Sequence, residues 1–230
     1  MAYNFKDKEE VELFLKNLGI EYRFGCFSEK KPEVCHLLGD YEESVNSNFK
    51  SAFKIYKNNC DTNDHAHSCY KAGGYFMQGK GIPKIDDSKA IDYLEKGCNL
   101  GNARACYRGA TLIAYGPDKL RDYNQGLEMF DKACSAEIAD ACFALNTFYL
   151  FGSKDHNVAK DSAKAAQYAT RGCELNHLGC CSNLSQMYRR GDGVHKDQKL
   201  ADRFMLKAKD IERQESTTID FELGLRSGSS

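Results

Sequence analysis

The cysteines are the feature that most constrains how this chain of 230 residues can fold. Ten of the 11 fall into five pairs: Cys26/Cys35, Cys60/Cys69, Cys98/Cys106, Cys134/Cys142 and Cys173/Cys181. The members of a pair are eight or nine residues apart, and the first cysteines of successive pairs follow one another at 34, 38, 36 and 39 residues. Structural zinc sites usually need C-x-x-C pairs, which this pattern lacks. The regular pairs therefore predict a disulfide framework.

A disulfide framework requires an oxidising compartment. Residues 1–19 lack the apolar core of a secretory signal, and their many Lys, Asp and Glu residues are untypical of a mitochondrial transit peptide. Two hypotheses are left: a signal peptide has been removed, or the chain is oxidised where no cleaved signal is needed. The mitochondrial intermembrane space is a compartment of the second kind, and we favour it.

The charges argue against two classes of binding protein. The chain has 32 Lys and Arg against 33 Asp and Glu, which gives a net charge of -1. A protein that binds nucleic acid by neutralising phosphates needs a surplus of basic residues. No stretch approaches 18 uninterrupted apolar residues, so we also expect no membrane-spanning helix.

The segments before the first cysteine of each pair resemble one another. Eight residues before it, mostly small residues recur: Leu18, Ala52, Ala90, Gly126 and Ala165. Four or five residues before it, an aromatic residue recurs: Tyr22, Tyr56, Tyr93, Phe130 and Tyr168. A sixth copy without cysteine aligns at Ala201, Phe204 and Ala208. A period of this length is typical of helical-hairpin repeats.

The segments after the second cysteine repeat as well. Apolar residues recur three, six and seven positions after it, as at Leu184, Met187 and Tyr188. A glycine follows at the tenth position in four copies: Gly79, Gly116, Gly152 and Gly191. Such spacings give the apolar stripe of a helix, and a glycine just past the stripe is a helix C-cap signal. Since no period of two is sustained, the fold class is all-α.

Each unit is thus predicted to be a helical hairpin, with its cysteine pair at the junction of the two helices. A disulfide needs Cα atoms about 5.5 Å apart, which a tight helical turn provides. Closing a loop of nine residues contributes about 2.5 kcal/mol on the chain-entropy estimate. One hairpin cannot bury its own apolar face, so about five must stack into an α/α superhelical solenoid over residues 1–212. End helices are expected near residues 8–18 and 200–211, and residues 213–230 are expected to be a disordered tail.

Two segments resemble the signature of Sel-1-like repeats, which are related to TPR repeats. The stretch from Tyr188 through Gly191, Gly193 and Asp197 to Ala201 is one match, and residues 76–90 give a second. With one disulfide per hairpin, residues 5–212 are similar to the cysteine-rich Sel-1-like repeat proteins. Members of that family include secreted bacterial proteins and a mitochondrial factor for cytochrome c oxidase assembly. Residues 64–71, DHAHSCYK, resemble the latter.

The resemblance implies a soluble scaffold of the intermembrane space that supports assembly of cytochrome c oxidase, complex IV of the respiratory chain. We expect a monomer that binds other proteins through a concave groove and is oxidised by the disulfide relay of that compartment. One alternative is a haem-binding or thiol–disulfide redox factor in the same pathway. Another is a secreted cysteine-rich repeat protein of bacterial type.

Candidate ligand and catalytic residues are few. Cys60, His65, His67 and Cys69 are metal-ligand types, but the repeat explains both cysteines, so we predict no metal site and keep His65 and His67 as weak candidates. No cofactor is required. Haem is the candidate cofactor that we consider, with the possible axial ligands His36, His177, His195, Met77, Met129 and Met187. No C-x-x-C-H motif accompanies them, and Met129 and Met187 lie on helical stripes typical of core residues.

Cys180 is the thiol that the repeat does not explain. One interpretation is a small buried residue. The alternative is a free thiol that attacks the Cys173–Cys181 bridge, which would give weak thiol–disulfide reductase activity. Since neither G-x-S-x-G nor H-E-x-x-H occurs, we predict that the protein is not an enzyme.

Overall fold

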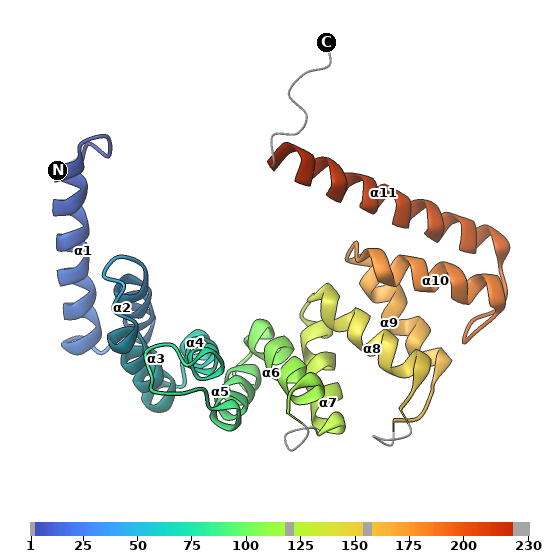
Figure 1. The fold of residues 1–230 in the computed structure, drawn as a ribbon, viewed down its shortest axis with the longest axis horizontal. Coiled ribbons are helices and arrows are strands. Elements are labelled where there is room, and N and C mark those ends of the chain that lie inside the picture. Colours follow the sequence, from blue (N-terminus) through green and yellow to red (C-terminus); the bar gives the residue numbers. More distant parts are fainter. Residues whose placement is uncertain (1–2, 118–121, 154–157, 223–230) are drawn as a thin grey trace, which may run out of the picture. The chain divides into compact units, whose positions relative to one another are not determined.

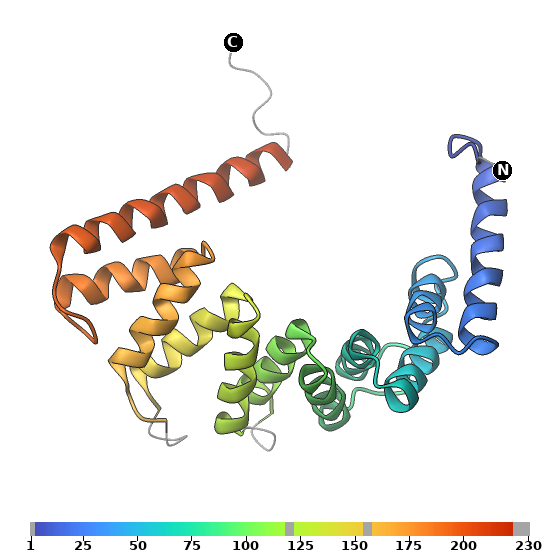
Figure 2. The same cartoon turned by 180° about the vertical axis from the view of Figure 1, so that it is seen from behind.

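The computed structural model describes residues 3–117, 122–153 and 158–222, with side chains described as far as residue 216. The described residues form eleven α-helices and no β-strand (Figures 1 and 2). Ser153 and Val158 make an isolated antiparallel bridge. The prediction of an all-α fold is confirmed.

The helices belong to two compact units, Met1–Arg121 and Asp122–Ser230. The first unit holds α1 (Lys8–Phe27), α2 (Pro32–Ser44), α3 (Phe49–Asn63), α4 (Ala66–Gln78), α5 (Asp87–Asn99) and α6 (Ala103–Tyr115). The second holds α7 (Tyr123–Ser135), α8 (Ala139–Phe151), α9 (Ser162–Glu174), α10 (Leu178–Arg190) and α11 (Gln198–Glu222). The sequence predicts one continuous solenoid over residues 1–212. Helices in such a stack pack only on their neighbours, so each unit buries a core of its own.

Within each unit every helix packs on the next one along the chain. Odd-numbered helices end at or near the first cysteine of a pair, and even-numbered helices begin a few residues before the second. The first five odd-numbered helices begin after an N-cap residue whose side chain accepts a hydrogen bond from a backbone N–H of the first turn. These N-cap residues are Asp7, Asn48, Asp86, Asp122 and Asp161. All four predicted glycines directly follow an even-numbered helix.

In three copies, a residue that recurs in the sequence is less buried than its neighbour on the odd-numbered helix. In α1 the buried small residue is Gly19, which lies against Tyr41, and not the neighbouring Leu18. In α5 and α9 the residue four before the cysteine is buried, whereas Tyr93 and Tyr168 five before it are only half-buried. These tyrosines carry a hydroxyl that needs a polar partner, and each donates to an aspartate near the surface.

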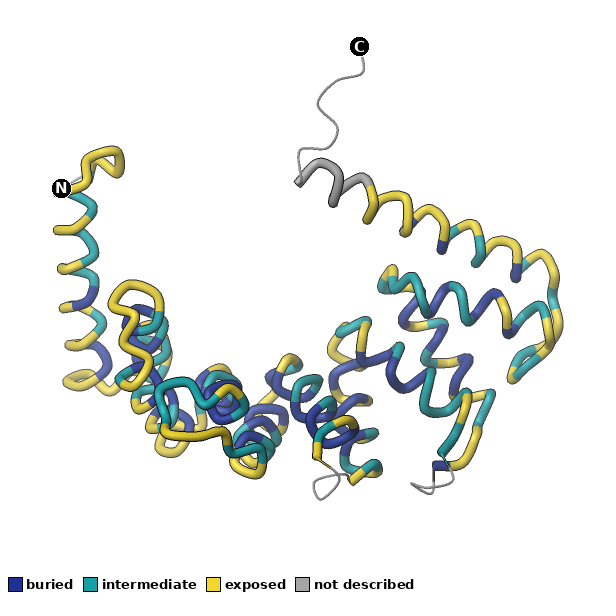
Figure 3. The backbone as a smooth tube through the Cα atoms, viewed as in Figure 1, coloured by how far each residue is buried: buried dark blue, intermediate teal, exposed yellow. Residues whose placement is uncertain are grey.

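A second set of small positions brings successive hairpins together. The residue four positions after the second cysteine is small or short and polar, and it is buried in every copy: Gly39, Gly73, Ala110, Asn146 and Ser185. A Cβ at Gly73 would lie 2.6 Å from Cγ of the buried Leu94 in the next helix. In two later copies the side chain bonds to a backbone carbonyl of the next helix, Asn146 to Ala165 and Ser185 to Ala201. Figure 3 shows the resulting buried stripes along the inner sides of the helices.

Basic residues of α5, α9 and α11 join these helices to the preceding hairpin. Lys96 donates to the backbone carbonyl of Cys60 at 2.8 Å, and Lys207 donates to that of Cys173 at 2.6 Å. Arg171 donates to the carbonyl of Ser135. The last carbonyls of a helix have no partner within the helix, and the helix C-terminus carries a partial negative charge. A basic side chain from the next repeat supplies both the missing hydrogen bond and a positive charge.

The last helix is longer than predicted. We placed the end of the repeats at residue 212, but α11 continues to Glu222. The remainder of the expected tail, residues 223–230, lies outside the described residues. None of the helices in the described part of the chain is both long and apolar enough to cross a membrane.

Two adjacent glycines of α4 test the packing between hairpins. Gly73→Ala should lower the free energy of unfolding by about 1–3 kcal/mol, because its methyl group would collide with Leu94. Gly74→Ala is the matched control, since only the flexible end of Arg108 lies nearby, and helix propensity should raise stability by up to about 1 kcal/mol. Urea unfolding of both variants measures the difference. Equal effects of the two substitutions would show that no close approach occurs at Gly73.

Candidate functional site

Disulfide bonds cross the junction of five helical hairpins. The structure joins Cys26–Cys35, Cys60–Cys69, Cys98–Cys106, Cys134–Cys142 and Cys173–Cys181. Their Cα atoms lie 4.5 to 4.8 Å apart, which is at the short end of the range for disulfides. These are the five pairs that the spacing predicts.

Glycines next to the first cysteine let two of the junctions contact the preceding one. A Cβ added at Gly97 would lie 3.2 Å from Cβ of Cys69, which belongs to the preceding pair. A Cβ at Gly172 would lie 3.2 Å from Cβ of Cys142, again in the preceding pair. The bridges of neighbouring hairpins are therefore layered within each unit, with glycine as the spacer.

Cys180 fills the space beside one of these glycines. Its side chain is fully buried, and a Cβ at Gly172 would collide with its sulfur. Burial, with a smaller effect of the Asp140 carboxylate, raises the pKa of the Cys180 thiol to about 12. The thiolate is the nucleophile in disulfide exchange. A buried thiol with such a pKa fits the interpretation of Cys180 as a small core residue better than that of an exchanging thiol.

Two of the candidate histidines start helices. Nδ1 of His65 accepts a hydrogen bond from the backbone N–H of Ser68, and Nδ1 of His177 accepts one from that of Cys180. Both stand four residues before the second cysteine of a pair, where Asn102 starts α6 in the same way. An accepting Nδ1 places the proton of a neutral ring on Nε2, so neither nitrogen of that ring offers a lone pair for a metal.

His65 belongs to a cluster with His36 and His67. The ring centroids lie 5.1 Å apart for His36 and His65, 5.8 Å for His36 and His67, and 6.0 Å for His65 and His67. The hydroxyl of Ser68 lies 3.2 Å from Nδ1 of His36 and accepts a bond from Asn59. In the part of the chain that the structure describes, no three His, Cys, Asp or Glu side chains are placed to hold a metal ion.

An ion network lies beside the histidine cluster. The carboxylate of Glu43 accepts bonds of 2.8 Å from both Lys71 and Lys80, and Tyr56 donates to Asp40 at 2.6 Å. Burial opposes ionisation of Glu43, but the two lysines outweigh it and lower its pKa to about 2. Burial and the Asp40 carboxylate raise the pKa of Tyr56 far above its ordinary value. Each charge is paired, so this network supports the fold rather than a reaction.

The candidate haem ligands do not gather at one site. Met129 and Met187 are buried as predicted for core residues, while His195 is exposed on a loop. His177 stacks on Phe143 and faces Asp140 in addition to starting its helix. Met129, Met187 and His177 thus have structural roles in the second unit.

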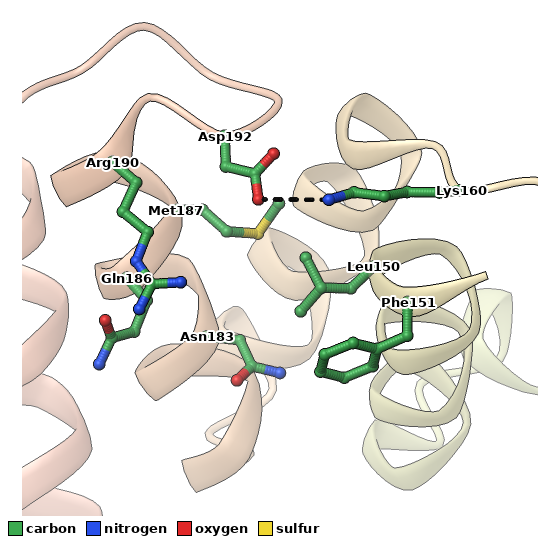
Figure 4. Close-up of a pocket in the computed structure, with 8 residues that line it drawn as sticks. All are labelled: Leu150, Phe151, Lys160, Asn183, Gln186, Met187, Arg190 and Asp192. Carbon is green, nitrogen blue, oxygen red and sulfur yellow. Dashed lines mark ion pairs between the residues drawn. The ribbon is translucent and has the colours of Figure 1, made fainter.

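A pocket of about 260 Å³ lies between α8 and α10 in the second unit (Figure 4). Leu150, Phe151 and Met187 form its apolar part, and Asn183, Gln186, Arg190, Lys160 and Asp192 surround them. Phe151 is 73% exposed at the end of α8. Sequence analysis missed this pocket, because its residues come from two hairpins and share no motif.

The pocket has the chemistry of a protein-binding site. Its volume is below the ~300–1,000 Å³ of small-molecule sites. Exposed aromatic and arginine side chains, such as Phe151 and Arg190 on opposite sides of this pocket, are typical of interface hot spots. Lys160 and Asp192 form an exposed ion pair at 4.0 Å, which contributes little. A partner with an apolar side chain next to a carboxylate would fit beside Phe151 and Arg190.

Two further hollows lie over the odd-numbered helices of this unit. One of about 480 Å³ and one of about 340 Å³ share Tyr168, whose hydroxyl bonds to Asp131. Acidic residues line both hollows, among them Glu128, Glu137 and Glu174. None of these three cavities has a histidine in its lining.

Comparison with known proteins identifies the family. Residues 66–102, 103–137, 139–177 and 179–210 match the Sel1 repeat. The chain is 38% identical to the cytochrome c oxidase assembly factor 7 homolog of Drosophila melanogaster, and the match covers 98% of both chains. The chain belongs to the cytochrome c oxidase assembly factor 7 family. The factor of Xenopus tropicalis is 38% identical, covering 92% of this chain and 93% of that one, and the human factor is 33% identical, covering 92% and 94%.

Solved structures show the same fold as this assembly factor 7 relative. A Sel1 repeat protein from Oxalobacter formigenes aligns with a TM-score of 0.70 at 19% identity, over 86% of this chain and 84% of that one. A protective antigen of uropathogenic Escherichia coli strains aligns with a TM-score of 0.56 at 18% identity, over 84% and 52%. These neighbours, with the Sel1 matches, confirm the predicted fold of stacked hairpins.

Cys180 of this assembly factor 7 relative should resist alkylation while the protein is folded. At about pH 7 iodoacetamide should leave the native chain unmodified and add one group, on Cys180, after unfolding without reductant. Because the pKa of Cys180 is raised in the folded state, its neutral thiol contributes fully to the stability of the fold below about pH 9. This contribution is lost as the pH rises through about 12. Rapid labelling of Cys180 in the native protein, read by mass spectrometry, would contradict its burial.

His36 should make the stability of this family member depend on pH. Burial, aided by His65, His67 and Lys71 and opposed by Asp40, lowers its pKa from 6.5 to about 4. The folded state disfavours the charged ring, so stability is full above pH 6.5 and falls as the pH falls toward 4. The loss should be on the order of 1–3 kcal/mol.

Urea unfolding at about pH 7 and about pH 4.5 measures this dependence. His36→Phe should show a smaller difference between the two pH values than the natural chain. The same substitution at the exposed His195 serves as the control and should leave the difference unchanged. An unchanged difference in the His36 variant would remove this residue as the cause.

Proposed function

We propose that this protein acts in the assembly of cytochrome c oxidase, as a scaffold that binds other proteins and catalyses no reaction of its own. The observation that carries the proposal is the family match, since the likeness to assembly factors runs over nearly the whole length of both chains. A repeat fold with exposed hollows and an apolar pocket suits protein binding.

The mitochondrial intermembrane space is the compartment that we propose. Five disulfide bonds demand an oxidising environment, and the disulfide relay of that space would supply it. The names of the relatives support a mitochondrial role. Sequence similarity to animal assembly factors over nearly the whole chain favours this proposal over a secreted protein of bacterial type. The similarity to bacterial proteins is one of fold.

The pocket beside Phe151 is the binding site that we propose for the partner. Phe151 offers a large apolar surface to solvent, and Arg190 stands across the pocket beside Gln186, with Asn183 nearer to Phe151 (Figure 4). A redox role has less support, since the thiol of Cys180 is buried. A haem-handling role has less support, since Met129 and Met187 are buried and His177 starts a helix.

Rescue in Drosophila cells that lack their own assembly factor 7 homolog tests the proposed function. The natural chain should restore assembled complex IV, measured by native gel electrophoresis and oxidase activity. Failure to restore it, although the chain accumulates in oxidised form in the intermembrane space, would contradict the proposal.

Phe151→Ala tests the binding site in the same cells. Truncating an interface anchor typically weakens binding about tenfold, so rescue should fall clearly below that of the natural chain. Ile85→Ala removes an exposed apolar side chain outside the pocket and is the control. Full rescue by the Phe151 variant would exclude this pocket as the essential contact.

A further inference from the structure

The first helix has an apolar side that no other described part of its unit covers. Gly19, Tyr22 and Cys26 face α2, where Tyr22 lies 6.3 Å from Tyr41 between ring centroids. Large apolar residues elsewhere on α1 are exposed to solvent: Leu13 by 52%, Phe24 by 59%, Phe27 by 63%, and Ile20 by 54% beside a hollow that it shares with Tyr41 and Val45. Figures 1 and 2 agree that α1 lies beside α2 on one side only.

The last helix shows what an end helix in contact with solvent looks like. Along its described side chains, α11 exposes one large hydrophobic residue, Leu206, among charged residues such as Asp202, Arg203 and Asp210. Terminal repeats of a soluble solenoid need such a polar outer face. The outer face of α1 breaks this rule, and exposed apolar patches of this kind mark interaction sites.

The spacing of the exposed apolar residues on α1, together with the half-buried Asn17, fits a partner that is itself a helix. Leu13, Asn17, Ile20, Phe24 and Phe27 follow one another at steps of four, three, four and three residues. This is the heptad pattern of a two-stranded coiled coil, with Asn17 and Phe24 at a positions and the others at d positions.

The charges beside this stripe complement a second copy of the same helix. Lys16 holds a g position and Glu21 an e position, and residues five apart do not face each other on one helix. In a parallel pair a g residue faces the e residue five positions further along the partner. Lys16 of each copy would thus meet Glu21 of the other. In an antiparallel pair, Lys16 would face the basic g residues of the other copy; Arg23 is already paired with Glu42 of α2 at 2.9 Å, so Lys16 carries the uncompensated charge.

Asn17 supports the same arrangement. Its amide donates one hydrogen bond, of 3.2 Å, to the hydroxyl of Tyr3, and an amide has a second N–H and a carbonyl oxygen to offer. An asparagine at a single a position favours the parallel two-stranded state, because the two amides can bond to each other.

We propose that two copies of this protein associate through a parallel, two-fold pairing of their α1 helices. The contacts of α2 with Gly19, Tyr22 and Cys26 leave Leu13, Phe24 and Phe27 open to the second copy. The stripe spans only two heptads, but both helices are already ordered by their packing. We expect a dissociation constant on the order of 10 μM. This association replaces our expectation of a monomer.

Sedimentation equilibrium of the full oxidised chain over a range of concentrations tests the proposal. The natural chain should pass from monomer to dimer as the concentration rises. Leu13→Glu should remain a monomer, whereas Leu206→Glu, the matched change on the outer face of α11, should dimerise like the natural chain. A natural chain that stays monomeric throughout, or a Leu13 variant that dimerises as well, would overturn it.

Charge variants test the direction of the pairing without altering the apolar stripe. Lys16→Glu should raise the dissociation constant about tenfold, since each dimer contains two such pairs. Adding Glu21→Lys should restore the natural value to within about threefold. Stronger association of the Lys16 variant would indicate an antiparallel pair and overturn the parallel arrangement.

Discussion

The close approach of two antiparallel helices at every hairpin junction is the constraint on which the rest of this structure depends. The bridged cysteines bring Cα atoms to within 4.5 to 4.8 Å, and glycines such as Gly97 and Gly172 leave room for the preceding junction. Small residues four positions after the second cysteine, such as Gly73, then admit the next hairpin. Bridges within hairpins and small residues between them together set the repeat, because a single hairpin cannot bury its own apolar face.

Much of this fold could be predicted from the sequence, because its determinants are local. Each cysteine pair spans eight or nine residues, and each C-cap glycine ends the helix directly before it. The register of the buried face was less certain. An aromatic residue such as Tyr168 satisfies the apolar pattern, yet its hydroxyl draws it toward Asp131 and leaves Ala169 in the core. The repeat pattern also does not predict how many compact units the helices form, since every repeat resembles every other.

The candidate sites show where a single sequence is insufficient. His65 and His177 have the residue type of a ligand, but they start helices through Nδ1. The signal was present, since both stand where Asn102 starts another helix, four residues before the second cysteine. The pocket beside Phe151 left no such signal, because Arg190 reaches it from the following hairpin. Contacts between repeats depend on side-chain directions that periodicity alone does not specify.

Disulfide mapping of the protein isolated from cells, with free thiols trapped before any reductant is added, tests the account most directly. The intact mass should lie ten hydrogen atoms below that of the fully reduced chain, two for each bond. Five linked peptide pairs should be found, each from one hairpin junction. After unfolding, Cys180 should carry the trapping reagent. Peptides linking cysteines of different hairpins, or Cys180 bonded in place of Cys181, would contradict it.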